Sequence, residues 1–300
     1  MIVIRKHVVP EGIKDIRFSD YGLEVFKEFS SRKSFIKAIK RGEFKIDGKL
    51  GTTARYIRTG MEIELLDLEI PSPEVYEIKL EIVYEDEDLA VIFKPAGIEV
   101  SGNKFKTVNN ALLNNVKISS LADALRIPRP VHRLDFPTSG LLLIAKTRSA
   151  LADLGRQFED KVVQKRYRAV VMGKIPESGI LNDPINGQSA ESQFKLVSTA
   201  KSIKSETLSL IDLWPKTGRT HQLRIHVSEF GYPILGDSLY GPKGKILCGK
   251  GLFLCAVELN FKHPFTGEMM KVETDDPAKF EHFMQGEQRR WEKYNIGEKG

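Results

Sequence analysis

The sequence predicts an α+β fold rather than a doubly wound α/β fold, because predicted strands outnumber predicted helices and the two do not alternate regularly. A length of 300 residues is typical of two domains, and it suffices for an extensive core without disulfides or metal ions. Positive charge gathers near the N-terminus. We therefore expect a small α+β domain over residues 1–70, a linker over residues 71–77 and a larger domain over residues 78–300.

The composition favours a soluble globular protein, with 29% charged and 41% hydrophobic residues. The sequence has neither an apolar run of about 18 residues, which would predict a membrane span, nor the apolar core of a secretory signal. Cys248 and Cys255 are the only cysteines, and no Cys or His cluster with zinc spacing accompanies them. We expect a cytoplasmic protein without a metal site, and its net charge of +6 is consistent with a nucleic-acid partner.

The first expected helix lies in the most basic stretch, residues 27–58, which carries a net charge of +7. Ser30 and Ser31 can cap a helix that runs to about Arg41, where Gly42 can end it. Helical spacing predicts an outward basic stripe of Lys33, Lys37, Lys40 and Arg41, and an inward face of Phe35, Ile36 and Ile39.

A small hairpin is expected after this helix. Residues 44–46 alternate in polarity, Asp47-Gly48 is typical of a tight turn, and residues 60–65 form a further strand. The sequence SRKSFIKAIKRGEFKIDGK resembles the S-four-type RNA-binding domain, which implies that the basic stripe contacts RNA. The alternative is that the stripe is only a solvated helix face.

The larger domain is expected to begin with strands. Two prolines near residues 71–77 favour a linker, and residues 94–97 read as a turn. Strands are predicted over residues 78–84, 89–93, 141–144, 167–172, 193–197 and 208–213, and helices over residues 151–159 and 277–294.

The segment HRLDFPTSGLL, residues 132–142, is the most informative motif of the chain. It places Asp135 on a loop just before an apolar strand, where an oriented carboxylate can act as a nucleophile or a base. The pattern HRLDxxTSGLL resembles the signature of the RluA-type pseudouridine synthases. That resemblance implies that Asp135 is the catalytic residue and that Arg133 fills the space left by a flipped nucleotide. An Asp that merely caps a turn is the alternative.

Two later segments resemble the same family. In residues 165–173 the resemblance implies that Tyr167 stacks on the target base. The alternative is that Tyr167 is only a core aromatic residue of a strand. Residues 217–226 resemble the third motif, which residues 231–237 extend, and Thr220 can cap a helix whose Leu223, Val227 and Phe230 share one face. The resemblance implies that Arg224 pairs with the catalytic Asp, the alternative being a surface arginine.

The resemblance spans nearly the whole chain and implies the pseudouridine synthase fold, a large mixed, mostly antiparallel sheet with flanking helices. It implies an RNA isomerase without cofactor or protein partner, and we expect a monomer. Arg219 and His221 are candidate phosphate or scaffold contacts. The added basic domain favours large-subunit ribosomal RNA as substrate, with tRNA as the alternative. Two rival functions are a non-catalytic RNA-binding or ribosome-assembly protein and a carboxylate-dependent glycosidase.

Overall fold

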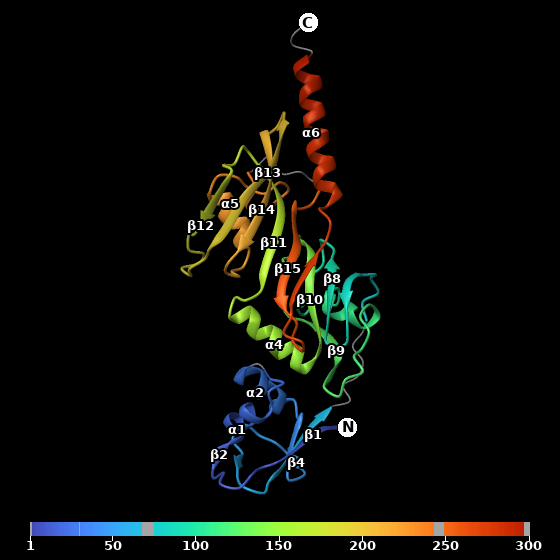
Figure 1. Ribbon diagram of the computed structural model, residues 1–300, viewed down its shortest axis with the longest axis vertical. Coiled ribbons are helices and arrows are strands. Elements are labelled where there is room, and N and C mark those ends of the chain that lie inside the picture. Colours follow the sequence, from blue (N-terminus) through green and yellow to red (C-terminus); the bar gives the residue numbers. More distant parts are fainter. Residues whose placement is uncertain (1, 30, 68–74, 243–248, 297–300) are drawn as a thin grey trace.

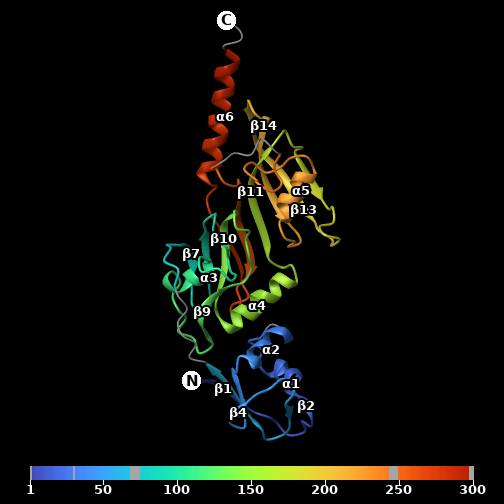
Figure 2. The same cartoon turned by 180° about the vertical axis from the view of Figure 1, so that it is seen from behind.

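The computed structural model describes residues 2–29, 31–67, 75–242 and 249–296 (Figure 1). The predicted cap Ser30, the first part of the predicted linker and Cys248 lie outside the described residues. Figures 1 and 2 show an elongated molecule with the N-terminal elements at one end, a large sheet in the middle and the C-terminal helix at the other end. None of the described helices is long and apolar enough to cross a membrane.

The N-terminal elements build an antiparallel sheet of their own, in the order β1-β6-β3-β4. Its strands are β1 (Ile2–Val8), β3 (Phe44–Ile46), β4 (Lys49–Leu50) and β6 (Glu62–Asp67), and a separate pair joins β2 (Ile16–Arg17) to β5 (Tyr56–Ile57). Helices α1 (Phe18–Val25) and α2 (Arg32–Lys40) pack on this sheet through a cluster of phenylalanines. The cluster contains Phe18, Phe26, Phe35 and Phe44, all fully buried and separate from the core of the large sheet.

Helix α2 and the following hairpin form where the sequence predicts them. The backbone N–H of Ser34 donates to the Ser31 hydroxyl, 3.2 Å away, which satisfies one of the free donors at the helix start. Asp47 and Gly48 have φ angles of 50° and 74°, the left-handed pair that a tight hairpin turn needs. The predicted inward position of Ile36 is only half-buried, because Ala38 rather than Ile36 lies on the fully buried face.

The large sheet has ten strands, with the main order β12-β13-β14-β11-β15-β10-β8-β7, while β16 pairs with β15 and β9 with β10. All strand pairs are antiparallel except β10 with β15, so the predicted mixed, mostly antiparallel sheet is confirmed. The strands are β7 (Glu81–Glu85), β8 (Leu89–Lys94), β9 (Ala124–Pro130), β10 (Ser139–Thr147), β11 (Gln164–Met172), β12 (Ser178–Leu181), β13 (Ser192–Ser202), β14 (Glu206–Pro215), β15 (Leu254–Lys262) and β16 (Met269–Glu273).

The described helices that follow β8 flank this sheet. They are α3 (Val108–Ala111), the 3-10 turn η1 (Leu112–Asn114), α4 (Arg148–Glu159), α5 (Gln222–Glu229) and α6 (Ala278–Ile296). Strand β10 is covered on both sides, since Leu142 and Ile144 join one core while Leu141 and Leu143 join the other. A strand buried on both faces reads as a continuous apolar run, as this one does. The loop before β10 therefore opens at the centre of the sheet.

Replacing Gly140 with alanine is expected to destabilise the fold by about 2–5 kcal/mol. Gly140 has a φ of 116°, and a Cβ atom there would lie 2.2 Å from the carbonyl oxygen of Ala256 on the parallel neighbour β15. The two strands would have to separate at the start of β10. Urea unfolding measures the effect. Gly286→Ala in α6 is the control, because its new Cβ would meet only the Arg290 side chain at an ordinary contact distance of 3.8 Å. This helix-forming residue should stabilise by about 0.5–1 kcal/mol, and equal effects of both changes would contradict the prediction.

Candidate active site

Asp135 lies on the loop that leads into β10, and Lys94 fixes this loop from beneath. The Lys94 ammonium is fully buried and donates to three backbone carbonyls, one of which is that of Phe136 at 3.4 Å. The N–H of Gly97 donates to the same Phe136 carbonyl, 2.8 Å away. Burial lowers the pKa of Lys94 to about 8, while the charge of Asp135 opposes that shift. Lys94 therefore stays charged at neutral pH and holds the backbone next to Asp135.

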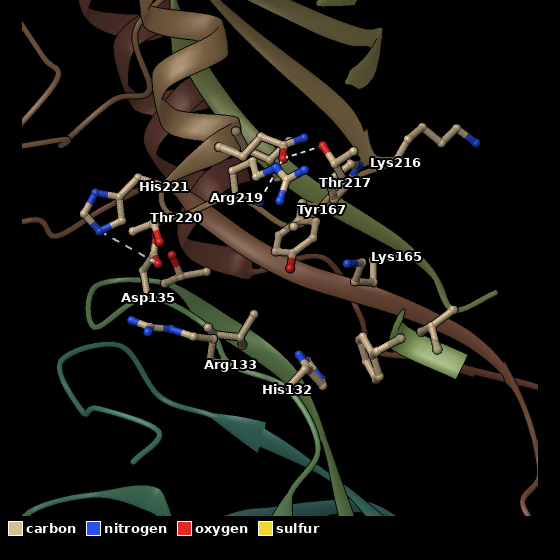
Figure 3. A pocket seen from close by; sticks show the side chains of 18 of the residues that line it. His132, Arg133, Asp135, Lys165, Tyr167, Lys216, Thr217, Arg219, Thr220 and His221 are labelled. Atoms are coloured by element: carbon tan, nitrogen blue, oxygen red, sulfur yellow. Dashed lines mark hydrogen bonds and ion pairs between the residues drawn. The ribbon is translucent and has the colours of Figure 1, made fainter. Parts of the chain in front are cut away.

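A cavity of about 480 Å³ opens beside this loop. Its walls come from four parts of the chain: the loop before β10, the end of α4 with the turn after it, strand β11, and the segment from the end of β14 into α5. Figure 3 shows Asp135, Tyr167 and His221 reaching toward the cavity from the first, third and fourth of these parts. A volume of this size suits a ligand as large as a nucleotide.

Arg224 and His221 face the Asp135 carboxylate. Nη1 of Arg224 lies 3.5 Å from Oδ2 of Asp135, and Nε2 of His221 lies 3.9 Å from Oδ1. Arg224 is only 2% exposed, so the alternative of a surface arginine is wrong. Burial opposes its charge, but the hydrogen bonds and charge of Asp237, together with Asp135, outweigh burial and raise the pKa of Arg224.

Asp237 holds Arg224 in place from the opposite side. Nε and Nη2 of Arg224 donate to its two carboxylate oxygens over 2.7 and 2.8 Å. Two backbone N–H groups, those of Leu239 and Tyr240, donate to it as well. Burial tends to raise the pKa of Asp237, but these hydrogen bonds outweigh it and the pKa is lowered. A bidentate arginine pair fixes the guanidinium plane, so Arg224 presents its remaining nitrogen to Asp135.

Tyr240 completes the cluster. Its ring lies under the Arg224 guanidinium, with 5.1 Å between Cζ and the ring centre, and its hydroxyl is 2.9 Å from Nδ1 of His221. Sequence reasoning assigned no role to Asp237 or Tyr240. The available signal was the apolar run Pro233–Leu235 followed directly by Gly236 and Asp237, which places a carboxylate against a buried segment.

The predicted start of helix α5 was wrong. The helix begins at Gln222 and its N-cap is His221 rather than Thr220, with no side-chain cap. His221 has a φ of 56°, a left-handed conformation that is unfavourable for a residue with a side chain. This turn brings the imidazole to Asp135, and strain of this kind is typical of functional sites. Leu223 and Val227 are buried as predicted, but Phe230 follows the helix end and is 43% exposed.

Tyr167 forms the wall of the cavity on β11. Its side chain is 9% exposed, and burial raises the pKa of Tyr167, with further contributions from Asp135 and Cys255. The phenol therefore stays neutral at physiological pH. Lys165 lines the cavity two residues earlier on the same strand, where burial lowers its pKa. Tyr167 therefore presents a neutral, largely buried side chain to the cavity.

The predicted residues Arg133 and Arg219 lie at the rim of the cavity, whereas His132, for which no role was predicted, belongs to the scaffold. Arg133 is exposed and lines the cavity, and within the described part of the chain its guanidinium has no hydrogen bond or ion pair. Arg219 also lies at the rim, where its Nε donates to the Ser189 carbonyl over 3.1 Å. His132 belongs to the scaffold, because it accepts the Leu143 N–H and burial lowers its pKa to about 3.

The basic stripe of α2 lies outside the cavity. Lys33, Lys37 and Lys40 are exposed and form no ion pair with any described residue, whereas Arg41 pairs with Glu43 over 2.6 Å. In Figures 1 and 2, α2 is the N-terminal element beside α4. The C-terminal end of α4 borders the cavity through Glu159.

One group among the described residues has a spacing that could hold a metal ion: Asp86, Asp88 and His263. The Asp86 carboxylate already accepts hydrogen bonds from Tyr84, His263 and two backbone N–H groups. These bonds occupy the oxygens that a metal would need, so we assign no metal to this group.

Known proteins resemble this chain along most of its length. The profile of the RNA pseudouridylate synthase family matches residues 88–229, which include Asp135, Tyr167 and Arg224. An uncharacterized RNA pseudouridine synthase of Aquifex aeolicus is 33% identical over 88% of this chain and 91% of its own length. Ribosomal large subunit pseudouridine synthase D of Pseudomonas aeruginosa is 32% identical over 93% of this chain and 94% of its own length.

A solved structure agrees in fold as well. The human RNA pseudouridylate synthase domain containing 1 superposes with a TM-score of 0.56 and 27% identity, over 66% of this chain and 84% of the human chain. The sequence relatives extend along almost the whole of both proteins, and the family profile covers the segment that builds the cavity. The chain therefore belongs to the RluA-type family of RNA pseudouridine synthases.

Proposed function

We propose that the protein isomerises uridines in large-subunit ribosomal RNA and that Asp135 is its catalytic residue. The observation that carries the proposal is the Asp135 carboxylate, held 3.5 Å from the buried Arg224 at a nucleotide-sized cavity walled by Tyr167. Pseudouridine differs from uridine only in its glycosidic link, which joins carbon to carbon instead of carbon to nitrogen. The conversion is redox-neutral and needs no activated donor, so the chemistry implies no cofactor.

Two routes are open to this carboxylate. In the first, Asp135 attacks the anomeric carbon, uracil leaves as an anion, and its carbon five then displaces the carboxylate, as in a retaining glycosidase. In the second, Asp135 removes the 2′ proton, uracil leaves, and the proton returns after the new bond forms. Both routes end with loss of the proton from uracil carbon five. Deuterium at the 2′ carbon distinguishes the two routes. Only the second route breaks the bond between the 2′ carbon and its hydrogen, so only that route should slow with deuterium.

The other site residues hold the substrate. Tyr167 stacks on the detached uracil, and Arg224 orients Asp135. Arg133 enters the space that the flipped nucleotide leaves, which its exposure and lack of a partner among the described residues support. Arg219 and His221 contact the RNA at the rim. Flipping costs a few kcal/mol and least in loops, so an unpaired uridine is the expected target.

The choice of ribosomal RNA rests on the relatives and on the N-terminal residues. Several relatives are ribosomal large subunit pseudouridine synthases. Residues 1–70 act as an S-four-type RNA-binding domain, residues 71–77 as a linker and residues 78–300 as the catalytic domain. The basic stripe of α2 contacts phosphates and raises the affinity for a large RNA. The protein works as a monomer in the cytoplasm. tRNA is the alternative substrate.

The proposed function is tested with RNA from cells that lack this gene, labelled with tritium at uracil carbon five. Ribosomal RNA and tRNA are separated and incubated with the protein, and tritium released to water is counted. Release from the large-subunit RNA fraction supports the proposal. Release from tRNA alone would overturn the assignment of the substrate, and release from neither would overturn the assignment of the reaction.

Changing Lys33, Lys37 and Lys40 together to glutamine is expected to weaken RNA binding and to lower its dependence on salt. Each lost phosphate contact should reduce the slope of log affinity against log salt by about 0.7–0.9. Filter binding at several salt concentrations measures the RNA affinity and its salt dependence. Deleting residues 1–70 should have a larger effect of the same kind. An unchanged affinity and slope would mean that the stripe is only a solvated helix face.

A further inference from the structure

A second cavity, of about 560 Å³, adjoins the first along the loop before β10. It shares Arg133, Asp135, His221 and Arg224 with the first cavity. The loop before β10 therefore borders both cavities through Arg133 and Asp135. A nucleotide placed in the first cavity leaves its chain neighbours close to this loop.

Exposed apolar side chains mark the second cavity. Phe136 is 53% exposed and Leu239 is 65% exposed, and both line it. The Phe136 backbone is nevertheless fixed, since its carbonyl accepts from Lys94 and Gly97. Phe136 and Pro137 occupy the two positions that the pattern HRLDxxTSGLL leaves free. An exposed ring on a loop with a fixed backbone, beside the Asp135 carboxylate, is suited to stacking on a base.

Glu99 is one of the charged residues that line this cavity, and it does not line the first cavity. Its carboxylate pairs with the exposed Lys104 over 2.7 Å, and its side chain is 31% exposed. The Glu99 carbonyl accepts the Val108 N–H, which fixes the backbone. A carboxylate repels a phosphate but accepts hydrogen bonds from the amino group of a base. Because Arg133 and Arg224 line the same cavity, charge alone does not choose between a base and a phosphate, and it is the exposed Phe136 ring that favours a base as occupant.

We propose that the second cavity takes the base of a nucleotide next to the target uridine, which stacks on Phe136 and offers an exocyclic amino group to Glu99. This proposal rests on the function proposed above. Flipping the target removes a stacking partner from its neighbours, and an aromatic side chain can replace that partner. Glu99 would then favour cytosine, adenine or guanine over uracil at the flanking position.

The test measures each protein variant on each of several RNA substrates. Target sites are first mapped by tritium release and sequencing, and short RNAs spanning one site are made with either flanking base present or removed. Phe136→Ala should lower kcat/KM about tenfold or more on the intact RNA. On the RNA that lacks the correct flanking base, wild type and Phe136→Ala should be equal. Phe136→Trp should restore the rate, and Phe265→Ala, at an 83% exposed ring that does not line either cavity, is the control.

Glu99 is tested with the flanking base changed from cytosine to uracil, which replaces the amino group with a carbonyl oxygen. Wild type should prefer cytosine several-fold, and Glu99→Gln should lose that preference because an amide can pair with either base. Effects of Phe136→Ala that are independent of both flanking bases would overturn the proposal while leaving the isomerase activity in place. Lack of tritium release by wild type would instead contradict the proposed function itself.

Discussion

Asp135→Asn is expected to abolish isomerisation while leaving RNA binding nearly unchanged. The amide has almost the same shape as the carboxylate, so the loop held by Lys94 should keep its conformation. An amide neither attacks the anomeric carbon nor removes the 2′ proton, so both proposed routes stop at their first step. We expect less than about a hundredth of the wild-type rate, the scale of loss seen when a covalent or general-base group is removed. Tritium release measures the rate, and filter binding measures RNA affinity.

The matched control for this change is Asp275→Asn, which makes the same replacement at an exposed position outside both cavities. It should retain wild-type activity. Turnover by Asp135→Asn above about a hundredth of wild type would rule out Asp135 as the catalytic residue. Loss of RNA binding together with activity would instead point to a damaged loop, which urea unfolding would reveal.

The sequence signals that worked were local ones. Helix α2 was predicted within a residue at each end, since a capping serine and a terminal glycine lie in the segment itself. The turn at Asp47 and Gly48 and the apolar run of β10 were predictable for the same reason. Matches to three motifs also predicted that Asp135, Tyr167 and Arg224 would meet, and the structure places all three at one cavity.

The features that were missed depend on contacts distant in the sequence. Strand β15 was not predicted, and neither was its parallel pairing with β10. The pairing could not be predicted, because an apolar run does not reveal which strand it will join. The role of Asp237 likewise depends on Arg224, thirteen residues earlier, and on backbone N–H groups of its own turn. The left-handed His221 was missed because tertiary contacts with Asp135 and Tyr240 override the local preference for a Thr220 cap.

Arg224→Met is expected to lower both stability and activity. A double variant that also carries Asp237→Asn should recover the stability but not the activity. The change leaves Asp237 fully buried without its cation, and breaking a buried pair from one side costs about 3–5 kcal/mol. Adding Asp237→Asn removes the stranded charge, so the double variant should regain most of the stability in urea unfolding. Activity should stay low, because neither variant restores a cation beside Asp135.

The pH dependence provides a second check on the same pair. The pKa of Asp237 is lowered in the folded protein, so its contribution is present above the ordinary carboxyl pKa of about 4 and is lost as pH falls through the lower folded value. The stability difference between wild type and the double variant should therefore shrink only in acid below about pH 4. Recovery of activity in the double variant would mean that Arg224 serves only to neutralise Asp237. Recovered stability without activity would instead place its function at Asp135.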